Sequence, residues 1–518
     1  MDNLLVVIPA IKKSAVIPDQ LVKKLNSITL IQRAINTAKE LTNNILVVTD
    51  SEEISLICER NNVKFYKDSK LKIDSNNIFS IINKIIDKRE EEHFFIYRAN
   101  TPLVNSDILK EAYKEFLKNE NIILTSVKKL DKDLFEYKDN NLIKIEHNYF
   151  KELKSFYIYK KNNKILKPFI IDYEYSIEIE SYQDWWICEK ILQRKRIIFN
   201  VIGSVEIGMG HIYHSLALAH EITDHEIIFV CDEKYKIVVD KIASKDYKVI
   251  STKNILKTIL ELKPDMVIND ILNTQKELIS ILKQNDIKVV NFEDLGDGSK
   301  KADLVINELY EEPLLKGEQY KWGHKYIILR DEFNNAKRHK FENVSAVLIA
   351  FGGTDQNNLT LLTLESIIDI IKQYNLELHI VCGNGYVFKD DLVNYINNIN
   401  YDKINLYFGV ETVSNIMEKT QIAISSNGRT VYELADMNIV SIIISHHKRE
   451  STHSFASLER GFINLGVFDK QNTLVLIKEN FQKIVTDDNY RKLLFLNIQK
   501  YSFRENKQKI VKQILELL

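Results

Sequence analysis

Residues 199–211, FNVIGSVEIGMGH, form the stretch of sequence that decides the fold. Its apolar first part, Phe199–Ile202, predicts a buried strand, and the helical pattern Ile212–Glu221 follows after a turn. The turn carries Gly208 and Gly210, whose lack of a side chain lets the backbone approach a ligand closely. The N–H groups at the start of the helix favour negative charge. The stretch therefore predicts either a phosphate-binding turn or a tight structural turn.

Short β-branched runs alternate with stretches of helical period on both sides of this segment. In the first part of the chain the predicted strands are 4–8, 45–49 and 94–97, and the predicted helices are 30–41, 52–61 and 77–88. The alternation starts afresh at residue 196, after a predicted helix at 185–192. Such alternation is typical of parallel sheets covered by helices, so we expect an α/β fold throughout.

A second break lies at residues 334–340, NNAKRHK, a polar and basic stretch between two strand-rich units. Together with the fresh start near residue 197, it divides the chain into three expected parts. These are an N-terminal domain of residues 1–197 and two lobes of residues 198–338 and 339–518. A length of 518 residues with 45% hydrophobic content is sufficient for several cores.

The composition excludes several classes of partner. Basic and acidic residues nearly cancel, 71 against 72, so no overall field draws the chain to nucleic acid. The four cysteines are scattered without metal-ligand spacing, which fits reduced thiols in a cytoplasm. No run reaches the roughly eighteen apolar residues of a membrane-spanning helix, and the apolar residues 4–8 follow no basic leader. We expect a soluble, cytoplasmic protein.

Two further glycine turns follow predicted strands, at 346–351 and 422–426. Turns at the carboxyl ends of strands are where open α/β sheets bind ligands, and two facing sheets would enclose a nucleotide. The turn residues predicted to contact a ligand are Gly352, Gly353, Thr354, Asp355, Asn427, Gly428, Thr430 and Glu433. This ordered series makes a binding role for the turn before His211 the better interpretation.

The part from about residue 198 onward resembles the UDP-sugar hydrolases of the pseudaminic acid pathway, relatives of the two-lobed GT-B glycosyltransferases. The resemblance includes a strand that ends in acidic residues and an interlobe leucine–arginine strand at 326–333. The residues that match the motifs of this family are Gly208, Gly210, His211, Glu293, Asp294, Gly352, Gly353, Thr354, Asp355, Gly428, Thr430, Tyr432 and Glu433.

This resemblance implies attack at the anomeric carbon of a UDP- or CMP-linked sugar, with His211 as the base and no cofactor. Glycine turns would hold the diphosphate, and Glu433 would accept hydrogen bonds from the ribose. A helix start disfavours the imidazolium form, which keeps a histidine there ready to accept a proton.

The chain departs from the family at three places. His214 stands where the family has an arginine, and residues 200–204 lack its usual arginine and aspartate. The loop 446–453, HHKREST followed by histidine, replaces a short turn. A zinc site is one interpretation of this loop, but no cysteine accompanies the histidines, and a solvated loop beside a phosphate pocket is the better one. Arg449 would then pair with a phosphate.

Residues 1 to about 195 resemble the cytidylyltransferases that activate sialic acid and related nonulosonic acids, which implies a Rossmann-like nucleotidyltransferase domain. The matching segments are 8–10, 17–18, 47–53, 71–75, 100–103 and 177–185. The resemblance implies Mg²⁺, which the carboxylates of Glu178 and Glu180 could hold. An alternative is that these two residues form the solvated face of an edge strand.

The nucleotide loop of this N-terminal domain differs from the family. Ile11 replaces an arginine, Lys12 and Lys13 replace glycines, and Gln20 stands where a lysine is expected. Bulky residues there would crowd a triphosphate. A ligand-binding or structural domain is therefore favoured over a working cytidylyltransferase, although the two lysines keep the second alternative open.

Three hypotheses follow for the whole chain. The first is an enzyme of nonulosonic acid metabolism whose C-terminal part hydrolyses a UDP-sugar. The second, favoured by the departures at His214 and 200–204, is a glycosyltransferase with a nucleotide-activated donor such as a CMP-nonulosonic acid. The third is a non-catalytic scaffold that binds nucleotide sugars.

Overall fold

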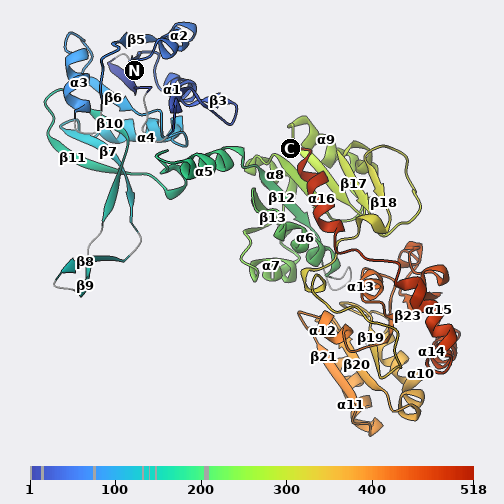
Figure 1. Cartoon of the computed structure of the whole chain (residues 1–518). Coiled ribbons are helices and arrows are strands. Elements are labelled where there is room, and N and C mark those ends of the chain that lie inside the picture. Colours follow the sequence, from blue (N-terminus) through green and yellow to red (C-terminus); the bar gives the residue numbers. More distant parts are fainter. Residues whose placement is uncertain are drawn as a thin grey trace. The chain divides into compact units, whose positions relative to one another are not determined.

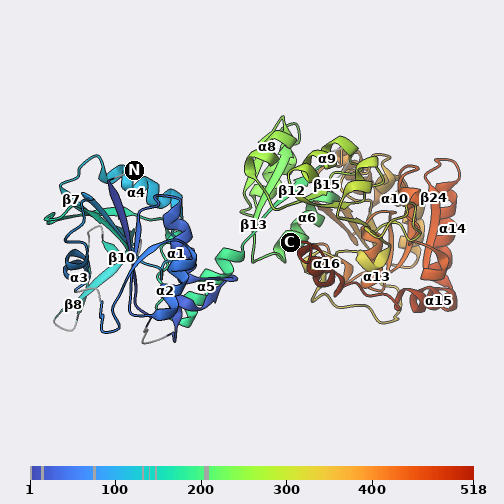
Figure 2. The same ribbon diagram turned by 90° about the horizontal axis from the view of Figure 1, so that it is seen from above.

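The computed structural model describes residues 3–12, 17–73, 77–130, 133–138, 141–145, 149–203 and 209–518. The chain separates into two compact units, Met1–Arg194 and Lys195–Leu518, which Figure 1 and Figure 2 show from two sides. Each unit is described by itself. None of the described helices is both long and apolar enough to cross a membrane.

The N-terminal unit is built on one seven-stranded sheet of order β11-β7-β10-β6-β1-β4-β5. Its strands are β1 (Leu4–Ala10), β4 (Ile45–Thr49), β5 (Lys64–Lys67), β6 (His93–Tyr97), β7 (Ile122–Lys129), β10 (Phe150–Tyr159) and β11 (Ile165–Ile170). Only β10 runs antiparallel to its neighbours in this sheet. A separate pair, β8 (Leu134–Lys138) and β9 (Asn141–Ile145), projects from the unit (Figure 1).

Helices cover both faces of this sheet. They are α1 (Leu30–Lys39), α2 (Glu52–Arg60), α3 (Ile78–Ile85), α4 (Ser106–Phe116) and α5 (Tyr182–Gln193). Along β1, Leu4, Val6 and Ile8 belong to one buried cluster, and Leu5 and Val7 to another. Successive side chains of a strand point to opposite faces, so a continuous apolar run marks a strand buried on both sides.

The first lobe of the C-terminal unit is a seven-stranded parallel sheet of order β14-β13-β12-β15-β16-β17-β18. Its strands are β12 (Arg196–Val201), β13 (Glu226–Asp232), β14 (Val249–Thr252), β15 (Met266–Asp270), β16 (Lys288–Phe292), β17 (Leu304–Asn307) and β18 (Tyr320–Trp322). Its helices are α6 (Gly210–His220), α7 (Lys236–Ala243), α8 (Ile255–Leu262) and α9 (Lys276–Gln284).

The second lobe is a six-stranded parallel sheet of order β21-β20-β19-β22-β23-β24. Its strands are β19 (Ala346–Ala350), β20 (Glu377–Cys382), β21 (Ile404–Phe408), β22 (Ile422–Ser426), β23 (Val440–Ser445) and β24 (Phe462–Val467). Its helices are α10 (Leu359–Gln373), α11 (Lys389–Ile399), α12 (Ser414–Met417), α13 (Thr430–Asp436), α14 (Thr473–Thr486) and α15 (Asp488–Ile498). Two parallel sheets covered by helices give the unit a GT-B type fold.

The last helix, α16 (Asn506–Leu515), returns to the first lobe. Its residues Ile510, Val511 and Ile514 are buried in the same cluster as residues of β12 and α6. Before it, Arg504 donates a hydrogen bond of 2.8 Å from Nε to the buried carboxylate of Asp436 at the end of α13. The end of the chain thus ties the two lobes together.

The predicted α/β architecture is confirmed in both units. The strands Ile45–Thr49 and Ile422–Ser426 occupy the predicted residues, and the other predicted strands and helices named above are present with ends shifted by a few residues. Two expectations were wrong. Residues 326–333 form no strand, because they consist of 3-10 turns around an irregular stretch whose Ile327, Ile328 and Leu329 are buried. Residues 177–181 also form no strand, so Glu178 and Glu180 do not lie on an edge strand.

Candidate functional site

A cavity of about 510 Å³ lies between the two lobes of the C-terminal unit. Its first-lobe wall is formed by the start of α6 and by the segments that follow β15, β16 and β17. Because these strands are parallel, their carboxyl ends meet at one edge of the sheet. The second-lobe wall is formed by the turns after β19, β20, β21, β22 and β23.

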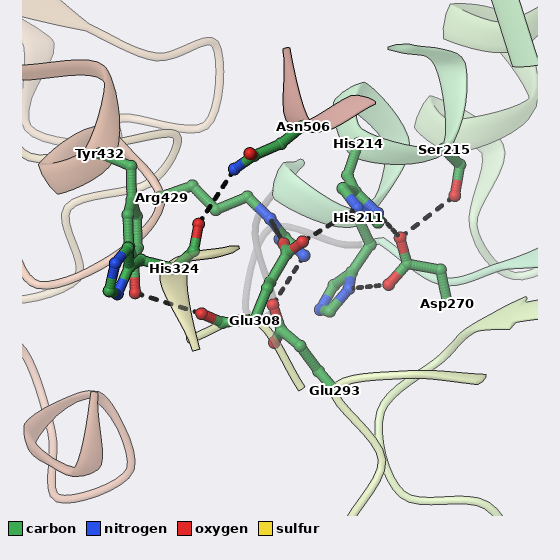
Figure 3. Close-up of polar contacts among 10 residues, drawn as sticks. All are labelled: His211, His214, Ser215, Asp270, Glu293, Glu308, His324, Arg429, Tyr432 and Asn506. Atoms are coloured by element: carbon green, nitrogen blue, oxygen red, sulfur yellow. Dashed lines mark hydrogen bonds and ion pairs between the residues drawn. The ribbon is translucent and has the colours of Figure 1, made fainter. Parts of the chain in front are cut away.

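Two histidines of α6 share one carboxylate at this edge (Figure 3). His211 Nδ1 lies 2.6 Å from Asp270 Oδ1, and His214 Nδ1 lies 2.7 Å from Asp270 Oδ2. Ser215 Oγ donates a third hydrogen bond of 3.1 Å to Oδ2. An ionised carboxylate only accepts hydrogen bonds, so both histidines carry a proton on Nδ1. This assignment leaves Nε2 of a neutral His211 as a proton acceptor.

Beyond His214 the charges continue to alternate. His214 Nε2 faces Glu308 Oε2 at 3.5 Å, and Glu308 Oε1 accepts a hydrogen bond of 2.9 Å from Arg429 Nε. Arg429 NH2 lies 2.6 Å from Glu293 Oε1. Arg429 precedes α13 in the second lobe, whereas Glu293 and Glu308 follow β16 and β17 in the first lobe. Figure 3 shows this network, which joins the lobes at the wall of the cavity.

Burial and charge shift several pKa values in this network. Burial disfavours the carboxylate of Asp270, but His211 and His214 outweigh this effect and hold its pKa far below the ordinary value. Burial likewise opposes the charged form of His214, yet the carboxylates of Glu308 and Asp270 raise its pKa to about 9. The pKa of Glu293 is lowered because Arg429 outweighs burial. These shifts favour the charged forms of Asp270, His214 and Glu293 at neutral pH.

A series of hydrogen-bonded asparagine side chains, the asparagine ladder, crosses the strands at the same sheet edge. Asn200 Nδ2 donates to Asn269 Oδ1 at 2.9 Å, and Asn269 Nδ2 donates to Asn291 Oδ1 at 2.9 Å. Asn291 Nδ2 donates in turn to Asp294 Oδ2 at 2.6 Å. The ladder crosses β12, β15 and β16, and all of its members are buried. Asn200 in β12 thus has a structural role, because it starts the hydrogen-bonded series that leads to the residues after β16.

The glycine turns of the second lobe bring the backbone close to the cavity. Gly352 adopts φ 81°, a conformation that favours glycine. A Cβ added at Gly383 would lie 2.3 Å from Gly353 O, so the turns after β19 and β20 are in contact. A Cβ at Gly428 would meet no atom within 4 Å, because this glycine faces open space.

Two charged residues of the second lobe also line the cavity. Glu433 Oε1 accepts a hydrogen bond of 2.9 Å from Arg330 Nε, which occupies one of its oxygens. Burial raises the pKa of Glu433, although Arg330 acts in the opposite direction. Arg449 NH2 is buried and has no hydrogen-bond partner within the described part of the chain. An unpaired guanidinium nitrogen at a cavity wall suits an anionic ligand.

The structure brings most of the predicted site residues together. The cavity is lined by Gly210, His211, Glu293, Gly352, Gly353, Thr354, Gly428, Thr430, Glu433 and Arg449. Gly208 lies outside the described residues.

Three other predicted site residues are not among those that line the cavity, because their polar groups serve the fold. Asp294 accepts hydrogen bonds from the backbone and hydroxyl of Thr274, and Asp355 caps the start of α10. Asn427 Nδ2 donates to backbone oxygens of Glu450 and His453.

The residues that sequence reasoning missed are Asp270, Glu308, Arg429 and Arg330. Asp270 ends the apolar stretch MVIND, and a charged residue at the carboxyl end of such a stretch is the signal that could have indicated it. His214 was noted as a departure from the family, but its ion pairs depend on residues far away in the sequence. Among the described residues, no group of three or more His, Cys, Asp or Glu side chains is arranged to hold a metal ion.

In the N-terminal unit, the two carboxylates predicted for Mg²⁺ lie in different surroundings. Glu178 Oε1 accepts hydrogen bonds of 2.7 Å from Arg98 NH1 and 3.0 Å from Asn100 Nδ2. Glu180 is exposed, and its backbone N–H donates to Asp184. A guanidinium thus already neutralises Glu178, so this arrangement does not fit a divalent cation.

The nucleotide loop of the N-terminal unit is also occupied by internal contacts. Lys12 Nζ lies 2.8 Å from Glu53 and 3.6 Å from Asp19. Gln20, which stands at the expected lysine position, is buried and donates from Nε2 to Ile179 O at 2.8 Å. Lys13 lies outside the described residues.

Comparisons with known proteins agree with the two predicted resemblances. Residues 5–197 match a family model described as cytidylyltransferase. The chain is 25% identical over 176 residues to the UDP-2,4-diacetamido-2,4,6-trideoxy-beta-L-altropyranose hydrolase of Campylobacter jejuni, which covers 32% of this chain and 63% of that protein. The predicted resemblance to cytidylyltransferases and to UDP-sugar hydrolases is thereby confirmed.

Two further relatives each match a larger part of this chain. An uncharacterized protein of Methanocaldococcus jannaschii is 32% identical over 263 residues, which is 47% of this chain and 54% of that protein. The pseudaminic acid cytidylyltransferase and UDP-2,4-diacetamido-2,4,6-trideoxy-beta-L-altropyranose hydrolase of Helicobacter pylori is 28% identical over 193 residues, 37% of this chain and 33% of that protein. The chain thus spans between 33% and 63% of the length of these three relatives.

Two solved structures also align with parts of the chain. MurG of Acinetobacter baumannii aligns with 62% of this chain and 99% of its own, at a TM-score of 0.47 and 12% identity. The CMP:2-keto-3-deoxy-manno-octonic acid synthetase complexed with CTP aligns with 37% of this chain and 98% of its own, at a TM-score of 0.30 and 10% identity.

Proposed function

We propose that the C-terminal unit is a nucleotide-sugar hydrolase that cleaves a UDP-sugar at the anomeric carbon. The observation that carries this proposal is the pairing of His211 with Asp270 at 2.6 Å on the wall of the interlobe cavity. The carboxylate orients the ring and stabilises the imidazolium that forms during proton uptake. The names of the Campylobacter jejuni and Helicobacter pylori relatives support a UDP-linked diacetamido-trideoxy sugar as the substrate class.

The proposed step is a displacement at carbon. The oxygen of a water molecule attacks the anomeric carbon, and the bond from that carbon to the diphosphate oxygen breaks. His211 Nε2 takes a proton from the attacking water, and the nucleoside diphosphate leaves with the electron pair. The proposed step uses no cofactor.

The second lobe supplies the binding groups in this proposal. The turns at Gly352–Gly353 and Gly428 let backbone N–H groups approach the diphosphate, and the start of α13 favours its charge. Arg449 offers a guanidinium nitrogen without a partner in the described part of the chain. In this proposal the second carboxylate oxygen of Glu433 accepts hydrogen bonds from the ribose.

The two departures that favoured a glycosyltransferase have structural partners. His214 belongs to the ion network, and Asn200 belongs to the asparagine ladder. These contacts explain both departures without a change of substrate, so the hydrolase is the better proposal. A glycosyltransferase would use the same groups with a sugar hydroxyl in place of water.

The test is nucleotide release from a panel of UDP- and CMP-sugars, with and without acceptor sugars. We expect release of UDP without an acceptor and its loss in His211→Gln, with nucleotide binding retained. Release that strictly requires an acceptor would replace the hydrolase with a glycosyltransferase. Binding without turnover, unchanged in His211→Gln, would support a scaffold.

For the N-terminal unit we propose ligand binding without cytidylyl transfer. Lys12 is paired with Glu53, and Glu178 with Arg98, so one lysine that would neutralise a triphosphate and one carboxylate that would hold a cation are already engaged. The test is pyrophosphate release from CTP and a nonulosonic acid in the presence of Mg²⁺. We expect none, and measurable release would contradict the proposal.

A further inference from the structure

His214 has carboxylates at both ends of its ring. It lies on α6 one turn after His211, and its side chain is fully buried. Nδ1 is 2.7 Å from Asp270 Oδ2, and Nε2 faces Glu308 Oε2 at 3.5 Å. Neither Nε2 nor Glu308 Oε2 has a hydrogen-bond partner within the part of the chain that the structure describes. Because both neighbours can only accept hydrogen bonds when ionised, a ring between them is best satisfied with protons on both nitrogens.

The other groups around His214 are also accounted for. Arg429 opposes a charge on His214, but it is paired with Glu308 and Glu293. The ring of Phe292 packs edge-on against that of His214 at 4.5 Å between centroids. On α6 itself, His211 and Ser215 bind the same carboxylate as His214. Two carboxylates thus face the two ring nitrogens of His214, whereas the one cation that opposes its charge is engaged by carboxylates.

We propose that His214, charged at neutral pH, is a positioning residue that divides the charge of Asp270 between two histidines and so keeps His211 available as a base. This inference rests on the proposed function, because it assigns His211 that role. With His214 charged, the three carboxylates Asp270, Glu293 and Glu308 face two cations, His214 and Arg429. The network is then one unit negative while His211 is neutral, and it becomes neutral when His211 accepts a proton.

A neutral residue in place of His214 would leave the network two units negative. The carboxylate of Asp270 would then interact with His211 alone, which would favour a proton on that ring before any substrate arrives. A base that is already protonated cannot accept a proton from water. The cation at position 214 therefore matters for the pH range in which the site is active.

The first experiment observes the charge directly in the full chain. The protein is labelled with ¹⁵N-histidine, and the ring nitrogen signals are recorded between about pH 6 and pH 10, a range that includes the expected pKa of His214. The His214→Gln spectrum identifies the signals of His214 by their absence. We expect both nitrogens of His214 to be protonated at pH 7.5. A neutral ring at this pH would overturn the proposal, whatever the enzyme turns over.

The second experiment compares pH profiles of nucleotide release for wild type, His214→Gln and His214→Arg. We expect His214→Gln to lower release by up to about tenfold at neutral pH. The acidic limb of the pH profile of this variant should move upward by about 1 pH unit. His214→Arg supplies a fixed cation and should retain the acidic limb of the wild type. A limb that stays in place in a folded His214→Gln variant would contradict the proposal.

The two experiments separate this inference from the proposed function. If the wild type releases no nucleotide from any donor, the hydrolase proposal fails, and the ring signals still decide the charge of His214. If His214→Arg does not fold, the comparison of wild type with His214→Gln remains. Folding of each variant is checked by circular dichroism.

Discussion

His211 and Asp270 are joined by a 2.6 Å contact between Nδ1 and Oδ1, although 59 positions separate them in the chain. We expect Asp270→Asn to lower kcat for nucleotide release by a factor on the order of 10³ to 10⁴, because an amide can present its NH₂ group to Nδ1 and so select the tautomer with a protonated Nε2. Steady-state kinetics and nucleotide titration check this, and the affinity for the nucleotide should change little.

Ser215→Ala is the matched control for this substitution. It removes one hydrogen bond of 3.1 Å to Asp270 and leaves both histidine contacts in place. We expect less than a tenfold loss of kcat. Equal losses in the two variants would mean that the carboxylate acts only through packing.

Arg429 neutralises two buried carboxylates, and its removal should destabilise the C-terminal unit. In Arg429→Met, Glu293 and Glu308 are left without their cation, which we expect to cost about 3–5 kcal/mol in the free energy of unfolding at pH 7. Denaturant unfolding measures this value.

The pH dependence of the free energy of unfolding tests whether the destabilisation in Arg429→Met is electrostatic. The pKa of Glu293 is lowered in the wild type, so its contribution to stability is present above the ordinary carboxylate pKa and is lost as the pH falls through the lowered value. The difference between wild type and variant should therefore shrink toward acid pH. Lys300→Met, which removes an exposed pair with Asp297, is the control and should change stability little. A constant difference at all pH values would argue against the electrostatic explanation.

Two glycines at the cavity should respond differently to alanine. In Gly383→Ala the new Cβ would lie 2.3 Å from Gly353 O, so the turn has to move, at a cost of about 1–3 kcal/mol. In Gly428→Ala no atom lies within 4 Å of the new Cβ, so stability should change by less than about 0.5 kcal/mol. We expect both variants to bind the nucleotide more weakly, because the first displaces the turn and the second places a methyl group in the cavity. Unfolding and calorimetric titration separate the two effects, and equal destabilisation would contradict the geometry.

Mg²⁺ should have little effect on the N-terminal unit. Because Arg98 already pairs with Glu178 at 2.7 Å, we expect no change in its Tm on addition of Mg²⁺. In Arg98→Ala the carboxylate of Glu178 loses this partner. If the Tm of this variant depends on Mg²⁺, the guanidinium of Arg98 takes the place of a cation in the wild type. A rise in the Tm of the wild type with Mg²⁺ would show instead that the cation displaces Arg98. Thermal unfolding with and without a chelator provides the measurement.

Local patterns in the sequence predicted the elements of the fold well. The strand Ile422–Ser426 could be placed because an apolar run bounded by turn residues depends on neighbouring positions only. The strand at residues 326–333, by contrast, was expected from the family resemblance, and wrongly. Their apolar side chains are buried, but by contacts along an irregular stretch between the lobes, which no local period reveals.

The cavity and its glycine turns could be predicted because they follow directly from strand ends in the sequence. Ten of the predicted residues line the cavity, His211 and Gly428 among them. Asp294, Asp355 and Asn427 stand in the same motifs, but their side chains bind the asparagine ladder, the start of α10 and loop backbone oxygens, respectively. The direction of a side chain at a strand end depends on its hydrogen-bond partners, and these lie in other segments.

The sequence by itself determined two α/β units, the turn that carries His211 and the second-lobe turns that face it, because these follow from apolar periodicity and glycine positions. Only the tertiary structure decided the partners of the charges. Asp270, Glu308 and Arg429 come from β15, β17 and the start of α13, and the two lobes have to meet before these residues form a network. Coulomb interactions depend on distance in space. The sequence therefore showed only that a histidine replaces the arginine of the family at position 214, whereas the fold surrounds this histidine with the carboxylates that favour its charged form.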